Sequence, residues 1–111
     1  MTYQHAELAA GRWHKMSLAE QLGNIGSEVS RARRAEGKQE ERFKAATDRA
    51  LELFDLTLSD VRWRGRLLEI GRARELFCDA LYGGKEYGAT LASLEPYFDR
   101  FALFAQARKG H

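Results

Sequence analysis

Proline, cysteine and long apolar runs are scarce in this chain of 111 residues, and each scarcity excludes a class of structure. The single proline, Pro96, indicates a helical protein, because helix interiors exclude proline whereas strand-connecting turns use it. The single cysteine, Cys78, cannot form a disulfide within the chain, which is typical of a reducing compartment. No apolar run approaches the roughly 20 residues that cross a bilayer, and the first residues lack a signal-peptide pattern. We therefore expect a cytoplasmic protein without membrane contact.

Histidine, the commonest catalytic base and metal ligand, occurs at three positions, His5, His14 and His111. None has a second histidine or a carboxylate at the spacing that builds a helical metal site, which excludes a di-iron bundle. The arginine–histidine motif of helical ribonuclease toxins is missing as well. Cys78 lies among apolar positions and is expected to be a small packed side chain. The sequence therefore predicts no enzyme activity, no metal and no cofactor.

Arginine is abundant: the chain has 18 basic residues, and 13 of them are arginine, against 16 acidic residues. The planar arginine fork binds carboxylates and phosphates through paired hydrogen bonds, which lysine does not. Such a composition indicates either ion-pair networks between helices or contact with phosphate. The net charge of +2 permits a nucleic-acid partner without requiring one.

Two helices are predicted in the first half of the chain. Ser17 to Glu20 form a capping box, in which the two side chains satisfy backbone amides at the start of a helix that Gly37 ends. The apolar residues of this helix recur every three or four positions: Leu18, Leu22, Ile25, Val29 and Ala32. A second helix is expected over residues 39–58, followed by a cap at Ser59 and Asp60.

Two more helices are predicted in the second half. The third carries the apolar stripe Leu67, Ile70, Ala73, Leu76, Phe77, Ala80 and Leu81. A loop over residues 83–90 precedes the fourth, in which we expect Pro96 to lie in the first turn. The predicted fold is all-α: an antiparallel up-down four-helix bundle over residues 17–111, preceded by an N-terminal arm over residues 1–16 that Trp13 and Met16 tie to the bundle.

A basic cluster around the predicted connector between the second and third helices is the first candidate site. Its members are Arg62, Trp63, Arg64, Arg66, Arg72 and Arg74. Arginines beside an indole suit a phosphate backbone and a stacked base. Alternatively, Arg66 and Arg72 pair with Asp48, Glu52 and Asp55 while Trp63 closes the end of the core. Because few acids lie nearby, we favour an exposed nucleic-acid-binding patch, with Arg31 and Arg34 as a weaker second group.

A polar row on the first helix is a candidate contact surface, formed by Gln21, Asn24 and Glu28. Neighbouring glycines destabilise a helix by about 1 kcal/mol each relative to alanine, so they suggest that another helix approaches closely. This contact is either internal to the bundle or between subunits. Tyr97 and Phe104 on the fourth helix are too widely spread for one apolar stripe and suggest a second interface.

Two segments resemble a group of short bacterial four-helix-bundle proteins: Leu18 to Ile25, and Glu41 to Ala46 with Ala50 to Leu53. The group comprises proteins encoded by intervening sequences of 23S ribosomal RNA genes and accessory variability proteins of diversity-generating retroelements. The connector from Arg62 to Gly65 departs from the group's pattern. The resemblance implies a basic, ring-like homo-oligomer, a pentamer. In the retroelement case, it implies a protein that assists a reverse transcriptase and its template RNA without catalysis.

We therefore expect a non-enzymatic, oligomeric accessory protein that binds nucleic acid, RNA in preference to DNA, in association with a reverse transcriptase. The alternative is a protein-interaction scaffold or an antitoxin-like partner whose arginines form structural ion pairs.

Overall fold

The computed structural model describes the backbone of residues 11–109 and most of their side chains, with those of residues 101–102 and 104–109 left out. Over this range the chain is helical and has no strand, which confirms the all-α prediction. The helices follow in the order η2 (Trp13–Lys15), α1 (Leu18–Ala35), α2 (Glu40–Leu58), η3 (Val61–Arg66), α3 (Leu67–Leu81) and α4 (Leu91–Lys109), where η is a 3₁₀-helix. Within the described residues, none of these helices has the length and apolar character needed to span a membrane.

The start and end of α1 follow the predicted signals. The Glu20 backbone N–H donates to Ser17 Oγ, and the Ser17 N–H donates to Glu20 Oε1, both at 3.1 Å. This reciprocal pair is the predicted capping box. After the helix, Gly37 adopts a φ of +74°, a conformation that glycine reaches without steric cost. The chain can therefore turn directly into α2.

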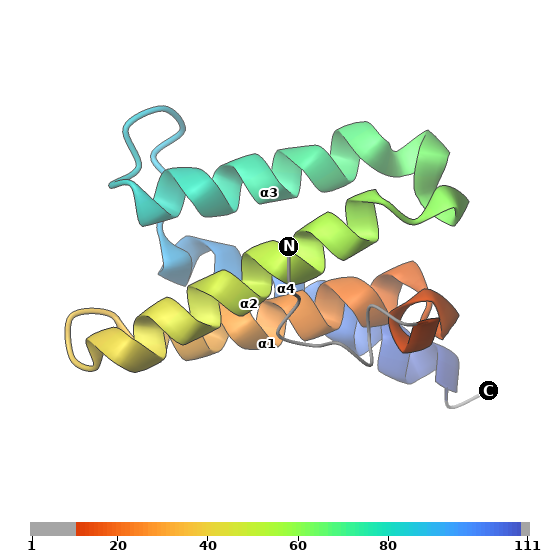
Figure 1. The fold of residues 1–111 in the computed structure, drawn as a ribbon, viewed down its shortest axis with the longest axis horizontal. Helices are drawn as coiled ribbons and strands as arrows, with labels where there is room; N and C mark the ends of the chain where they lie inside the picture. Colours follow the sequence, from red (N-terminus) through yellow and green to blue (C-terminus); the bar gives the residue numbers. More distant parts are fainter. Residues whose placement is uncertain (1–10, 110–111) are drawn as a thin grey trace.

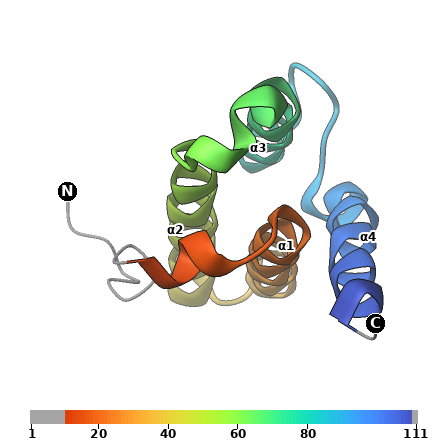
Figure 2. The same cartoon turned by 90° about the vertical axis from the view of Figure 1, so that its right-hand side faces the viewer.

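Helix α1 lies at the centre of the fold, between α2 and α4, and α3 packs on α2 and α4 (Figure 2). The turn between α1 and α2 lies at one end of the longest axis, and η3 lies at the opposite end (Figure 1). The first predicted basic group belongs to η3 and α3, and the second to the end of α1. The two groups are therefore carried by different parts of the bundle.

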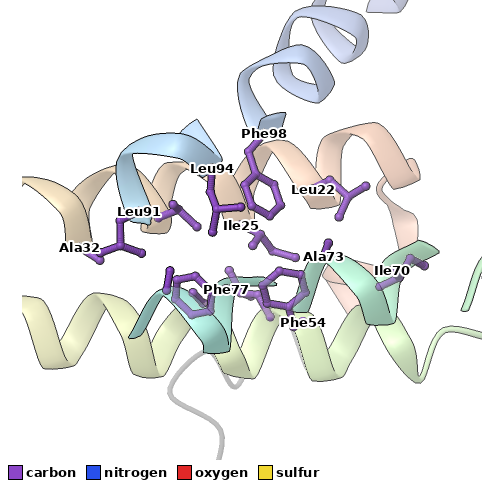
Figure 3. Close-up of a cluster of buried hydrophobic side chains, with 14 of the residues drawn as sticks. Leu22, Ile25, Ala32, Phe54, Ile70, Ala73, Phe77, Leu91, Leu94 and Phe98 are labelled. Atoms are coloured by element: carbon purple, nitrogen blue, oxygen red, sulfur yellow. The ribbon is translucent and has the colours of Figure 1, made fainter. Parts of the chain in front are cut away.

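The core is aromatic at its centre and aliphatic around it (Figure 3). The Phe54 ring lies 5.9 Å from the Phe77 ring and 6.0 Å from the Phe98 ring, measured between centroids. All three rings are buried, and each comes from a different helix. Aromatic packing at these distances adds to the free energy gained by removing the rings from water. These contacts join α2, α3 and α4.

Trp13 belongs to the bundle and not only to an arm. Its side chain is completely buried, and its indole Nε1–H donates to Thr57 Oγ1 at 3.1 Å. Met16 packs against the same core as a half-buried residue. The predicted contact of Trp13 and Met16 with the bundle is therefore confirmed, whereas residues 1–10 of the predicted arm lie outside the described residues.

The fourth helix begins earlier than Pro96 suggested, and that prediction was wrong. Thr90 and Ser93 exchange hydrogen bonds between side chain and backbone N–H, each 3.0 Å long, which starts the helix at Leu91. Pro96 is thus the sixth helical residue and lies in the second turn. There it removes one backbone hydrogen bond, because proline has no N–H. The cap that starts α4 is thus made from two hydroxyl side chains.

The loop between α3 and α4 is anchored by one carboxylate. Asp79, a buried residue near the end of α3, accepts hydrogen bonds from the backbone N–H groups of Glu86, Tyr87 and Ala89. Burial raises the pKa of Asp79, but these three bonds outweigh burial and leave its pKa below the usual value. The loop is therefore held to the bundle by charge-assisted hydrogen bonds.

Candidate nucleic-acid interface

Arg62 is engaged within the fold. Its guanidinium donates to both oxygens of the buried Asp60 carboxylate, with 2.7 Å between Nη2 and Oδ2, and Nη2 also donates to the Met16 carbonyl at 2.8 Å. The Arg62 hydrogen bonds hold the pKa of Asp60 well below its usual range, against the opposing effect of burial. Asp60 also caps η3, as predicted, by accepting from the Arg62 N–H. Arg62 thus stabilises the connector.

Trp63 matches the structural alternative in which it closes the end of the core. It is half-buried, and its Nε1–H donates to Gln21 Oε1 at 2.9 Å. The Arg62 guanidinium lies 4.4 Å from the ring centroid, over one face of the indole. A base stacked on Trp63 would have to use the other face or displace Arg62.

Arg66, Arg72 and Arg74 all have acidic neighbours. Arg66 pairs with Glu69 at 2.9 Å, Arg72 approaches Glu75 at 4.0 Å, and Arg74 pairs with Asp55 at 3.1 Å. The described partners of Arg66 and Arg72 are thus glutamates three residues further along the chain, whereas the alternative prediction gave them the acidic residues of α2. The side chains of these two arginines remain more than half exposed, and exposed pairs contribute little to stability.

Arg64 differs from its neighbours in the connector. It is exposed, and within residues 11–100 no ion pair engages it. The predicted patch therefore divides into a structural part, Arg62 with Trp63, and an exposed part. The exposed part is Arg64, together with the ion-paired Arg66 of η3 and Arg72 of α3, whereas Arg74 is half-buried.

The polar row of α1 faces two environments. Gln21 is completely buried, and its Nε2 donates to the Trp13 carbonyl at 2.9 Å and to Asp60 Oδ2 at 3.3 Å. Its contact is internal, so it cannot take part in a subunit interface as the folded chain stands. Asn24 is exposed and donates to the Glu20 carbonyl at 2.8 Å, which leaves it on the surface.

Of the two aromatic residues predicted as an interface on α4, the side chain of Tyr97 lies within the described part of the chain. Tyr97 is half-buried and packs edge-on against Phe98, with 5.2 Å between ring centroids. Burial, followed by the charge of Glu69, raises the pKa of Tyr97. The side chain of Phe104 lies outside the described residues.

The buried Glu28 carboxylate organises two arginines. Arg31 Nη1 lies 2.8 Å from Glu28 Oε1, and Arg49 Nε lies 3.0 Å from Glu28 Oε2. The Glu28 side chain is 5 % exposed, so its charge is compensated inside the fold by these two guanidinium groups. Each guanidinium has further N–H donors that Glu28 does not use.

Arg31 and Arg49 line a groove between the end of α1 and the start of α2, with a volume of about 610 Å³. Arg34 and Arg42 line it as well, and Glu41 is an acidic residue in its wall. In the part of the chain that the structure describes, no ion pair engages Arg34 or Arg42. We call this surface the arginine groove. It combines two cations that Glu28 fixes with two exposed cations for which the described residues supply no ion pair.

A second hollow, of about 540 Å³, continues the cationic surface around the end of α1. Arg34 lines both hollows, and Arg33 and Lys38 join it in the second. Arg33 is paired with Glu95 at 2.8 Å, but its side chain remains 48 % exposed. The two hollows thus share Arg34, and the second is also lined by the acidic Glu36.

Of the four arginines that line the groove, Arg31 and Arg34 were predicted from the sequence, whereas Arg42 and Arg49 were not. Arg42 and Arg49 are seven residues apart on one helix, and two turns of helix place such residues on one face. Pairing this spacing with Arg31 and Arg34 on the adjacent helix would have indicated the groove. Because only a short turn joins the two helices, these four arginines could have been expected to lie near one another.

The histidine and cysteine residues form no recognisable catalytic arrangement in the described range. His14 Nδ1 lies 3.2 Å from Asp60 Oδ2, while His5 and His111 lie outside that range. Cys78 is a half-buried free thiol with Arg74 Nη1 at 3.8 Å from its sulfur. Across the described residues, no three histidine, cysteine or carboxylate side chains gather as a metal site would require.

Comparison with known proteins identifies no relative: no protein-family model, no curated protein and no solved structure matches this chain.

Proposed function

We propose that this protein is a non-enzymatic accessory protein that binds the phosphate backbone of nucleic acid, RNA in preference to DNA, through the arginine groove. The observation that carries the proposal is the convergence of Arg31, Arg34, Arg42 and Arg49 on one groove. Arginine forks bind phosphate oxygens in pairs, and such contacts supply most of the affinity of sequence-independent binding.

The position of Glu28 supports binding of phosphate rather than a purely structural role. By holding Arg31 and Arg49 on its two oxygens, Glu28 limits the side-chain freedom that each arginine would otherwise lose on binding. The exposed Arg34 and Arg42 then supply charge without first breaking any ion pair with the described part of the chain. The continuation of the surface past Arg34 suits a chain of phosphates better than one small anion.

The exposed part of the connector patch supplies a second, weaker contact in this proposal. Arg66 and Arg72 can exchange an exposed carboxylate for a phosphate at little cost, and Arg64 has no ion pair to break among the described residues. In this proposal Arg62 and Trp63 stabilise the connector through Asp60 and Gln21 and do not contact the nucleic acid themselves.

The proposal includes a cellular context that rests on the sequence resemblance. The protein would act as a cytoplasmic homo-oligomer that assists the reverse transcriptase of a diversity-generating retroelement by holding its template RNA. Its four helices would form an antiparallel up-down bundle, an arrangement favoured by the short connections between α1, α2 and α3.

A second candidate is a protein-interaction scaffold or an antitoxin-like partner. The observation that favours it is that Arg62, Arg66, Arg72 and Arg74 all lie within 4.0 Å of an acidic oxygen. This candidate requires stable association with a protein and little salt-sensitive affinity for nucleic acid.

The test is binding of a fluorescent single-stranded RNA, followed by anisotropy, for two variants of equal charge. In the first, Arg34 and Arg42 are both replaced by alanine, and we expect binding to weaken about tenfold or more. In the control, Arg66 and Arg72 are replaced by alanine, which removes the same charge from the other surface and should change affinity much less. Equal losses, or a larger loss in the control, would contradict the assignment to the groove. Absence of RNA binding at low salt would favour the second candidate.

A further inference from the structure

The wall of the arginine groove contains an acidic residue, Glu41, beside its four arginines. Glu41 is exposed, and in the part of the chain that the structure describes no hydrogen bond or ion pair engages its carboxylate. Glu28 differs in this respect, because Arg31 and Arg49 both donate to its two oxygens. The Glu41 carboxylate therefore keeps its full capacity to accept hydrogen bonds, although guanidinium groups line the same groove.

The helix dipole explains an acid in the first turn of α2 but not an acid inside the groove. Glu40 and Glu41 both lie in that turn, where negative charge stabilises the helix. Glu40 has this effect without lining the groove. A carboxylate within a phosphate-binding groove repels every phosphate that enters. Glu41 therefore weakens binding unless the ligand also offers a hydrogen-bond donor.

In RNA, the donor that accompanies each phosphate is the ribose 2′-hydroxyl, which DNA lacks. A hydroxyl that donates to a carboxylate forms a charge-assisted hydrogen bond, which is stronger than a bond between neutral groups. Gln39 lines the same groove, and its side chain makes no capping bond to α2. Its amide can donate to the 2′-hydroxyl, which accepts as well as donates. Since the Gln39 amide is neutral, it does not repel DNA, and Glu41 is left as the residue that separates the two.

We infer that Glu41 is the residue by which the arginine groove distinguishes RNA from DNA. Its carboxylate accepts a hydrogen bond from a ribose 2′-hydroxyl and repels a strand that lacks this donor. The inference rests on the proposed function and deepens it, because it assigns the preference for RNA to one side chain. The arginines of the groove bind the phosphates of either nucleic acid.

The experiment compares three fluorescent single strands of one sequence of adenine and cytosine: RNA, DNA, and RNA in which every 2′-hydroxyl is methylated. The methylated strand keeps the phosphates and the 2′-oxygen but cannot donate a hydrogen bond from it. Anisotropy titrations at one low salt concentration give the three affinities. The wild-type chain should bind RNA about tenfold more tightly than either other strand, because only RNA forms the hydrogen bond to a charged group.

Two variants of equal charge decide whether Glu41 is responsible. Glu41→Ala should reduce the preference for RNA to about twofold or less, because DNA is no longer repelled and RNA loses its hydrogen bond. Glu40→Ala removes the same charge from the same turn of α2 but outside the groove, and it should keep the preference of about tenfold. Both side chains are exposed, so circular dichroism should show the wild-type helix content for both variants.

Three outcomes would overturn the inference and leave the proposed function in place, provided that binding still depends on Arg34 and Arg42. The first is equal affinity of the wild-type chain for the three strands. The second is a preference for RNA that survives Glu41→Ala, or that Glu40→Ala reduces as much. The third is a methylated strand that binds as tightly as RNA, which would assign the preference to the shape of the strand. Absence of binding to every strand would overturn the proposed function and the inference together.

Discussion

Replacing the buried Asp60 with asparagine should destabilise the fold more than the same change at an exposed aspartate. The Asp60 carboxylate is 3 % exposed and accepts hydrogen bonds from the Arg62 backbone, the Arg62 guanidinium and Gln21. Asparagine keeps the shape but loses the charge, so these bonds weaken together. A hydrogen bond to a charged group contributes about 1.5–3 kcal/mol, and Arg62, 37 % exposed, regains some hydration. We expect a loss of about 2 kcal/mol.

For a chain of 111 residues, this loss corresponds to a fall in Tm of about 8 °C. Thermal and urea denaturation followed by far-ultraviolet circular dichroism would measure it, with Asp99→Asn on α4 as an exposed control. A loss below about 0.5 kcal/mol would refute the reasoning, because it would mean that the Asp60 charge is dispensable to the network around η3.

The pH dependence of the same variant gives an independent check. The pKa of Asp60 is lower in the folded protein than in the unfolded chain, because Arg62 stabilises the ionised form. Its contribution to stability is therefore complete above the unfolded pKa, about 4, and is lost as the pH falls towards the folded value. The difference in unfolding free energy between wild type and Asp60→Asn should shrink as the pH is lowered below about 4. A difference that stays constant with pH would contradict this account.

Two further predictions concern α1 and the loop that precedes α4. Gly26→Ala should destabilise the protein by about 1–2 kcal/mol in urea denaturation, because the new methyl group would overlap Phe98 Cβ. This loss should exceed the gain from the higher helix propensity of alanine. Unchanged or increased stability would contradict the close contact of α1 and α4. Asp79→Asn should release the loop and speed trypsin cleavage after the exposed Lys85, while the rate of cleavage after Lys38 stays as in wild type. If the variant and the wild type were cleaved after Lys85 at the same rate, the loop would not depend on this carboxylate.

The helix boundaries were predictable wherever a local signal sets them. The capping box at Ser17 and Gly37 with its positive φ fixed the limits of α1, because each acts through neighbouring residues. The start of α4 was not predicted, since Thr90 and Ser93 form a hydroxyl-only cap that resembles ordinary loop sequence. Pro96 was therefore used as the marker of the first turn, and it misplaced the start of the helix.

The candidate site was less predictable because its contacts join residues far apart in the chain. Gln21 lies 39 residues from Asp60 and 42 from Trp63, yet it binds both. Composition and spacing give no means of assigning those partners, so the sequence leaves open whether Trp63 stacks on a base or closes the end of the core. Glu28 and Arg49, 21 residues apart, meet only because α1 and α2 pack side by side. Tertiary packing thus decided which arginines are structural and which are exposed.

The salt dependence of RNA binding tests most directly whether the arginine groove binds a nucleic-acid backbone. Four phosphate contacts predict that the logarithm of the association constant falls against the logarithm of salt concentration with a slope of about −3. Replacing Arg34 and Arg42 together should bring that slope closer to zero by one to two units. A wild-type slope near zero, or a slope that this double substitution leaves unchanged, would contradict the claim.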